Sequence, residues 1–109
     1  MLRLAQFRKM KRSAYLINTA RGGLIDHADL WQALEANLIA GAALDVFDPE
    51  PPDLSTPLMT DERVIITPHA AFVSEESLIE LRSRVARQIV DILSGRRPEC
   101  VVNPEVYCV

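Results

Sequence analysis

The sequence has few of the features that mark specialised classes of protein. It has two cysteines, Cys100 and Cys108, and their spacing fits neither a metal site nor a redox pair. A reducing cytoplasm is therefore the simplest setting, and we expect a cytoplasmic location. No apolar run approaches the roughly 20 residues that span a membrane. The basic start of the chain, residues 1–12, has no apolar core typical of a secretory signal.

A strong positive charge and a glycine-rich phosphate loop are also absent. The formal net charge of −3 gives no reason to expect nucleic acid as a direct partner. The four glycines form no Gly-x-Gly-x-x-Gly, the loop that cradles a pyrophosphate at a helix N-terminus. The two histidines are too few and too far apart to predict a metal site.

What is present is the pattern of an α/β domain. The 109 residues allow one domain, and 49% of them are hydrophobic. Short apolar runs alternate with helical periodicity, which predicts a parallel sheet with right-handed crossovers. We expect strands at residues 14–18, 41–47 and 64–67, and helices at residues 2–10, at residues 27–38, and between Ser74 and Gly95.

Four polar residues follow the expected strands at equivalent places. Arg21 lies past the end of the first strand, Asp45 and Glu50 at and beyond the end of the second, and His69 after the third. Because the carboxyl ends of parallel strands meet at one edge of a sheet, we expect these side chains to converge there.

Plainer interpretations remain open for three of these residues. Arg21 could be a surface arginine in a turn, and Glu50 could lie in a solvated proline-rich loop. Asp45 could accept hydrogen bonds from backbone amides of the next loop. We expect Trp31 to pack in a core or interface rather than on a ligand, and His27 to be a surface residue.

An arginine, a glutamate and a histidine at one site suit proton transfer next to a carboxylate group. Histidine acts as an acid or base near neutral pH, and a neighbouring carboxylate stabilises its imidazolium form. A guanidinium can bind an anionic substrate through paired hydrogen bonds. No serine or cysteine nucleophile is evident, so hydrolysis is not indicated.

Three blocks of sequence resemble the signatures of NAD-dependent D-2-hydroxyacid dehydrogenases. They are residues 18–23 (NTARGG), residues 43–47 (ALDVF) followed by Glu50-Pro51, and residues 67–71 (TPHAA). The branch most similar to this chain is the one with C-terminal-binding-protein-like and phosphoglycerate-dehydrogenase-like members. The resemblance implies an oxidoreductase with a Rossmann-type doubly wound sheet. Residues 1–95 would form part of its NAD-binding domain, and residues 96–109 an extended tail.

The resemblance also implies roles for individual residues. Arg21 would bind the carboxylate and carbonyl of a small 2-keto acid, and His69 would protonate the carbonyl oxygen as hydride arrives from NADH. Glu50 would pair with His69 and keep it protonated. Asp45 would contact the nicotinamide amide. The full set of cofactor-binding residues would be Thr19, Ala20, Arg21, Asp45, His69, Ala71 and Phe72.

The chain resembles only the carboxyl-terminal third or so of such an enzyme. The glycine-rich loop and the substrate domain of the family have no counterpart in it, so we expect the chain alone to be inactive. We also expect it to fold poorly alone or to associate, as a dimer or other homo-oligomer, or with a complementary segment. NAD is the expected cofactor, with NADP not excluded. The alternatives are an NAD(H)-sensing, corepressor-like protein-binding module and a truncated remnant with no function of its own.

Overall fold

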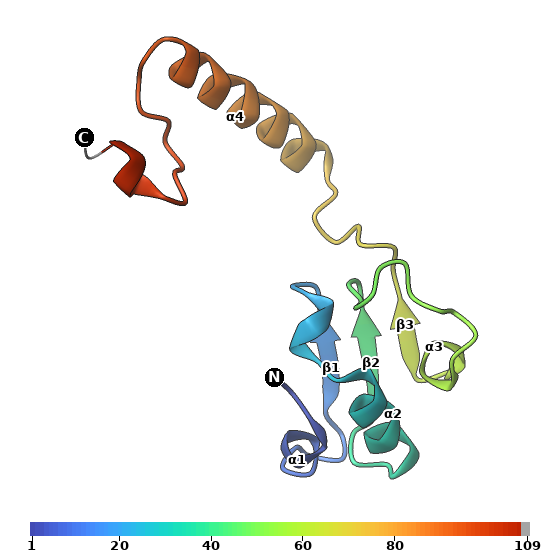
Figure 1. Cartoon of the computed structure of the whole chain (residues 1–109). Coiled ribbons are helices and arrows are strands. Elements are labelled where there is room, and N and C mark those ends of the chain that lie inside the picture. The colour runs from blue at the N-terminus through green and yellow to red at the C-terminus, as the bar shows by residue number, and fades with distance from the viewer. Residues whose placement is uncertain (108–109) are drawn as a thin grey trace. The chain divides into compact units, whose positions relative to one another are not determined.

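The structure, a computed structural model, describes residues 1–107 and divides them into two compact units. Residues 1–71 form the first unit, and the second begins at Phe72. The first unit contains the whole sheet, and the second contains a long helix and a short 3-10 turn (Figure 1). The two units meet after Ala71 and not after residue 95. The expected division into an NAD-binding part (residues 1–95) and a tail (residues 96–109) stays a prediction.

A three-stranded parallel sheet forms the centre of the first unit, in the order β1-β2-β3. Tyr15 in β1 is paired with Gly41 in β2, and Ala42 in β2 with Val64 in β3. The strands are β1 (Tyr15–Asn18), β2 (Gly41–Leu44) and β3 (Val64–Ile66). The predicted α/β fold with three parallel strands is therefore confirmed.

The second strand is shorter than the sequence predicts. Val46 and Phe47 were expected in it because they are apolar, and they are indeed only 0% and 7% exposed. Their burial comes from packing beyond the sheet, since the parallel pairing of β2 with both neighbours ends at Leu44. A run of apolar residues predicts that the residues are buried, but it does not predict the residue at which pairing between strands ends.

The helices of the first unit are short, and contacts near their ends account for this. Leu2 was expected in the first helix, but its N–H bonds to the Leu24 carbonyl oxygen at 2.8 Å. The second helix ends before residue 38 because Asn37 takes a positive φ of 51°. The helices are α1 (Leu4–Phe7), α2 (His27–Glu35) and α3 (Pro57–Thr60), with a 3-10 turn η1 (Gly22–Leu24).

The second unit consists of α4 (Glu75–Leu93) and the 3-10 turn η2 (Pro104–Tyr107). The Ser74 hydroxyl oxygen caps α4 by accepting a hydrogen bond from the Ser77 N–H at 3.0 Å. Gly95 follows the helix at a positive φ of 70°, as expected of a terminating glycine. Within the predicted tail, residues 96–109, residues 104–107 form η2 and residues 108–109 lie outside the described part of the chain. The tail as a separate part of the chain stays a prediction.

The core of the first unit lies on one side of the sheet. It includes Leu30 and Leu34 from α2 and Leu44 from β2, none more than 1% exposed. Side chains alternate across a strand, so the residues between the core positions point to the opposite face. That face carries Ile17 and Ile65, which are 70% and 67% exposed. One face of this parallel sheet is therefore apolar and uncovered within the unit.

Gly22 is the point at which the loop after β1 meets the loop after β2. A Cβ atom built on Gly22 would overlap the backbone carbonyl of Phe47 and lie 2.5 Å from the Asp48 nitrogen. A Cβ atom on Gly23 would meet only the Asp48 Oδ2 atom, at 3.1 Å, at the far end of a flexible side chain. The close backbone contact at Gly22 brings Arg21 next to the segment that carries Glu50.

Replacing Gly22 with alanine should therefore destabilise the fold far more than the same replacement at Gly23. Gly22→Ala forces one of two backbone segments to move, and we expect a loss of at least about 2 kcal/mol in the free energy of unfolding. Gly23→Ala needs only a side-chain shift and should cost less than about 1 kcal/mol. Urea unfolding of both variants measures the difference, and equal losses would contradict the backbone contact.

Candidate functional site

The carboxyl ends of the three strands lie at one edge of the sheet, and a loop leaves from each (Figure 1). The loop after β1 carries Arg21, the loop after β2 carries Asp45 and Glu50, and the loop after β3 carries His69. The parallel topology thus places the four polar residues that we singled out in the sequence at the same edge. Their roles in chemistry stay predictions.

Glu50 and His69 form a hydrogen-bonded pair. The Nδ1 atom of His69 lies 3.0 Å from Oε2 of Glu50, and the other oxygen, Oε1, accepts the Phe47 N–H at 2.8 Å. The Phe47 hydrogen bond, followed by the contact with His69 and the charge of Arg21, lowers the pKa of Glu50. An ionised carboxylate can only accept, so Nδ1 carries the proton that is shared with Glu50. The Nε2 atom of His69 is left to face a ligand.

Asp45 fixes the loop in which His69 lies. Asp45 is 3% exposed, and its carboxylate accepts three hydrogen bonds: from the Thr67 hydroxyl at 2.5 Å, the Ala70 N–H at 2.8 Å and the Ala71 N–H at 2.9 Å. The Thr67 bond is the main cause of a lowered pKa of Asp45. His69 lies between these donors at a positive φ of 53°, which few non-glycine residues adopt. Asp45 therefore helps to hold the His69 backbone in a rare conformation.

Two interpretations of Asp45 were open: hydrogen bonding to backbone amides of the next loop, and contact with a nicotinamide amide. The structure shows the first. The carboxylate accepts backbone amides of the next loop, and the hydroxyl of Thr67. Oδ1 accepts two of the three bonds and Oδ2 accepts one, which leaves Oδ2 with a further acceptor position. Contact with a nicotinamide amide stays a prediction.

Asn18, which the sequence analysis did not single out, organises the loop before Arg21. Its side chain is 5% exposed; Oδ1 accepts the Ala20 N–H at 3.1 Å, and Nδ2 donates to the Arg21 carbonyl oxygen at 2.9 Å. An asparagine whose side chain accepts from the residue two positions later forms an Asx turn, and its place at a strand end was the available signal. The guanidinium of Arg21 is exposed and donates to the Ala20 carbonyl oxygen at 2.6 Å.

A hollow of about 700 Å³ opens beside the Glu50–His69 pair. Its walls are mainly apolar, and Glu50 and His69 are the ionisable groups among the described residues that line it. The apolar walls come from both neighbouring loops and from β3, and include Phe47, Pro51 and Ile66. The pair thus faces a space of the size that small ligands occupy.

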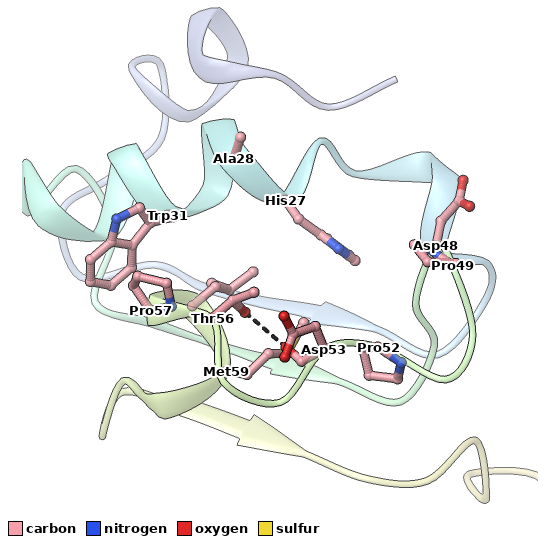
Figure 2. Close-up of a pocket in the computed structure, with 11 residues that line it drawn as sticks. His27, Ala28, Trp31, Asp48, Pro49, Pro52, Asp53, Thr56, Pro57 and Met59 are labelled. Atoms are coloured by element: carbon pink, nitrogen blue, oxygen red, sulfur yellow. Dashed lines mark hydrogen bonds between the residues drawn. The ribbon is translucent and has the colours of Figure 1, made fainter.

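His27, which was expected to be a surface residue, is half-buried. Its Nε2 atom is buried and makes no hydrogen bond to any described residue, and burial lowers the pKa of the ring. The cause is the loop after β2, which runs beside the first turn of α2 and encloses a second hollow of about 370 Å³ with it (Figure 2). Trp31 lines this hollow and packs against the core, in keeping with its expected packing role.

Three further expectations concern Phe72, membrane-spanning helices and metal-binding groups. Phe72 is the first residue of the second unit, and its expected place near the nicotinamide stays a prediction. Within residues 1–107, no helix has the length and apolar content needed to cross a membrane. The same residues contain no group of three or more His, Cys, Asp or Glu side chains arranged to hold a metal ion.

Comparison with known proteins identifies the family. The family model described as "D-isomer specific 2-hydroxyacid dehydrogenase, NAD binding domain" matches residues 1–71. This chain belongs to that family, as the three sequence blocks predicted. Among curated relatives, a glyoxylate reductase of Thermofilum pendens is 44% identical over 101 residues, which cover 93% of this chain and 30% of that protein. A D-3-phosphoglycerate dehydrogenase of Methanocaldococcus jannaschii is 46% identical over 98 residues, 90% of this chain and 18% of that protein.

Solved structures give the same result. A D-isomer specific 2-hydroxyacid dehydrogenase from Lactobacillus delbrueckii ssp. bulgaricus, in its NAD complexed form, matches with a TM-score of 0.79 and 36% identity over 94% of this chain and 35% of that one. An NADPH-dependent glyoxylate/hydroxypyruvate reductase from Sinorhizobium meliloti matches with a TM-score of 0.76 and 32% identity over 92% of this chain and 33% of that one. This chain therefore spans about a third or less of the relatives that it matches.

Replacing Asp45 with asparagine should loosen the His69 loop. In either orientation, the amide NH2 group faces at least one of the three donors, which leaves that donor unpaired. We expect a loss of about 1–3 kcal/mol in the free energy of unfolding, and faster exchange of the Ala70 or Ala71 amide proton. Asp53→Asn is the matched control, since Asp53 uses only Oδ1, to accept from Ser55. A similar loss in both variants would contradict the special position of Asp45.

The burial of His27 should make stability depend on pH near neutrality. Because its pKa is lowered from 6.5 in the folded chain, the unfolded chain takes up the proton first as the pH falls, which favours unfolding. Asp26 and Asp48 lie near the ring and act in the opposite direction, but burial is the larger effect. The free energy of unfolding should fall as the pH drops through the ordinary histidine pKa of 6.5, and fall less in His27→Gln. An equal decline in both chains would contradict this prediction.

Proposed function

We propose that this chain carries the acid–base and substrate-anchoring residues of an NAD-dependent D-2-hydroxyacid dehydrogenase, an oxidoreductase. The observation that carries the proposal is the Glu50–His69 hydrogen bond of 3.0 Å at the sheet edge to which the Arg21 loop also runs. Relatives named glyoxylate reductase and D-3-phosphoglycerate dehydrogenase support a small 2-keto or 2-hydroxy acid as the substrate.

In this proposal each residue has one task. The exposed guanidinium of Arg21 binds the substrate carboxylate through paired hydrogen bonds. His69 donates the proton at Nε2 to the carbonyl oxygen when the keto acid is reduced, and accepts it back in the reverse direction. Glu50 accepts from Nδ1, so it orients the ring and stabilises the imidazolium form. The buried Asp45 keeps His69 in place.

The residues present fit the nicotinamide end of the cofactor. NAD(H) exchanges a hydride with the carbon atom that carries the substrate oxygen. The free acceptor position on Asp45 Oδ2 suits the carboxamide N–H2 group, and the Thr19–Ala20 loop and Ala71 border the same edge. The chain has no glycine-rich loop for the pyrophosphate. We propose NAD; both NAD and NADPH complexes occur among the solved relatives.

We also propose that the chain associates, as a homo-oligomer or with a complementary segment. The exposed apolar face of the sheet, with Ile17 and Ile65, supports this, because parallel sheets are normally covered on both faces. The exposed free thiol of Cys100 suits a reducing cytoplasm, which is the location that we propose.

Titration calorimetry tests the proposed function on the 109-residue chain. NADH should bind saturably, and Asp45→Ala should weaken that binding about tenfold or more, because it removes the amide acceptor. Oxamate, a substrate mimic with a carboxylate, should then bind to the NADH-loaded chain, and Arg21→Ala should abolish this second step even at NADH concentrations that saturate the variant. Arg12→Ala is the charge-matched control, and circular dichroism checks that each variant is folded.

Absence of NADH binding by a folded chain would contradict the proposal. That result would favour one of the two alternatives: a protein-binding module, or a remnant with no function of its own. If the Asp45→Ala variant binds NADH as tightly as the unaltered chain, the cofactor site is retained but the role that we give to Asp45 is lost.

A further inference from the structure

His27 packs directly against the residue that orients Glu50. Its imidazole meets the Phe47 ring edge-on, with the ring centroids 6.1 Å apart and the planes at 64°. The Nε2 atom has no hydrogen-bond partner among the described residues, so this nitrogen does not anchor the ring. Figure 2 shows the side chain extending from α2 into the space beside the loop that follows β2. Packing therefore holds the two rings together.

Phe47 connects this contact to the Glu50–His69 pair. Its backbone N–H donates to Oε1 of Glu50 at 2.8 Å, and the other carboxylate oxygen meets His69 at 3.0 Å. Its carbonyl lies against Gly22, where a Cβ atom would overlap it. The backbone of Phe47 is thus fixed on one side by the Gly22 loop, and its ring is fixed by His27. The ring contact and the N–H that binds Glu50 thus belong to the same residue, at the start of the segment that carries Glu50.

We propose that His27 is a positioning residue for the Glu50–His69 pair and acts through Phe47. The proposal rests on the proposed function for the importance of the pair, but the positioning itself can be measured without catalysis. A buried polar atom without a partner is uncommon, and in this proposal the packing of the ring on Phe47 is the reason for its presence. If ring packing is what matters, phenylalanine should replace His27, and alanine should not.

Nuclear magnetic resonance of the uniformly labelled 109-residue chain tests this link. In His27→Ala, the Phe47 amide proton should exchange with water about tenfold faster, because its bond to Glu50 is weakened. The pKa of Glu50, which the Phe47 N–H lowers, should rise towards its ordinary value, as read from the side-chain carboxyl carbon. His27→Phe should keep both the exchange rate and the pKa close to those of the unaltered chain.

The Asp45 amide is the internal control, because it bonds to the Asn18 carbonyl oxygen at 2.9 Å and not to Glu50. A purely structural role would speed exchange at Asp45 and Phe47 alike, and that result would overturn the proposal. So would an unchanged pKa of Glu50 in His27→Ala, or failure of His27→Phe to keep that pKa lowered.

If His27→Ala does not fold, His27→Gln is measured by the same criteria. A chain whose Phe47 amide is unprotected even without substitution also contradicts the proposal. Loss of NADH binding with these results intact would refute the proposed function alone.

Discussion

The buried carboxylate of Asp45 is the interaction on which the candidate site depends. It is 3% exposed, and its burial is tolerable only because three donors from the loop after β3 bind to it. Those three bonds tie the end of β2 to the His69 loop and support a backbone conformation that His69 would otherwise avoid. The orientation of the exposed histidine is therefore set by a carboxylate beneath it, which has little access to solvent.

The backbone after β2 links the loops on either side of it. The Phe47 carbonyl lies against Gly22, and its N–H bonds to Glu50. Arg21 precedes that glycine, and its charge contributes to the lowered pKa of Glu50. Two contacts of Phe47 thus help to position the residues of the proposed chemistry. The contact with Gly22 places the Arg21 loop, and the bond to Glu50 orients the carboxylate that meets His69. This arrangement explains how partly exposed side chains from separate loops can keep a defined geometry.

The sequence predicted the fold and the edge of the sheet at which the site lies, because alternating apolar runs and helical periodicity determine both. It predicted too long a second strand, since the apolar character of Val46 and Phe47 reflects burial beyond the sheet. It misplaced His27, because the burial of a helix's first turn depends on a loop some twenty residues later. Asn18 was missed although its Asx-turn signal is local. The hydrogen bonds of Asp45 depend on tertiary structure, which composition and spacing cannot supply.

Arg21, Glu50 and His69 come from one continuous stretch of chain, residues 21–69, inside a single compact unit. The groups proposed to move the proton and hold the carboxylate therefore need no side chain from the second unit to reach one another. The groups that support them, from Asn18 to Ala71, lie in the same unit. The residues of the proposed chemistry and their supports therefore occupy one continuous block of sequence.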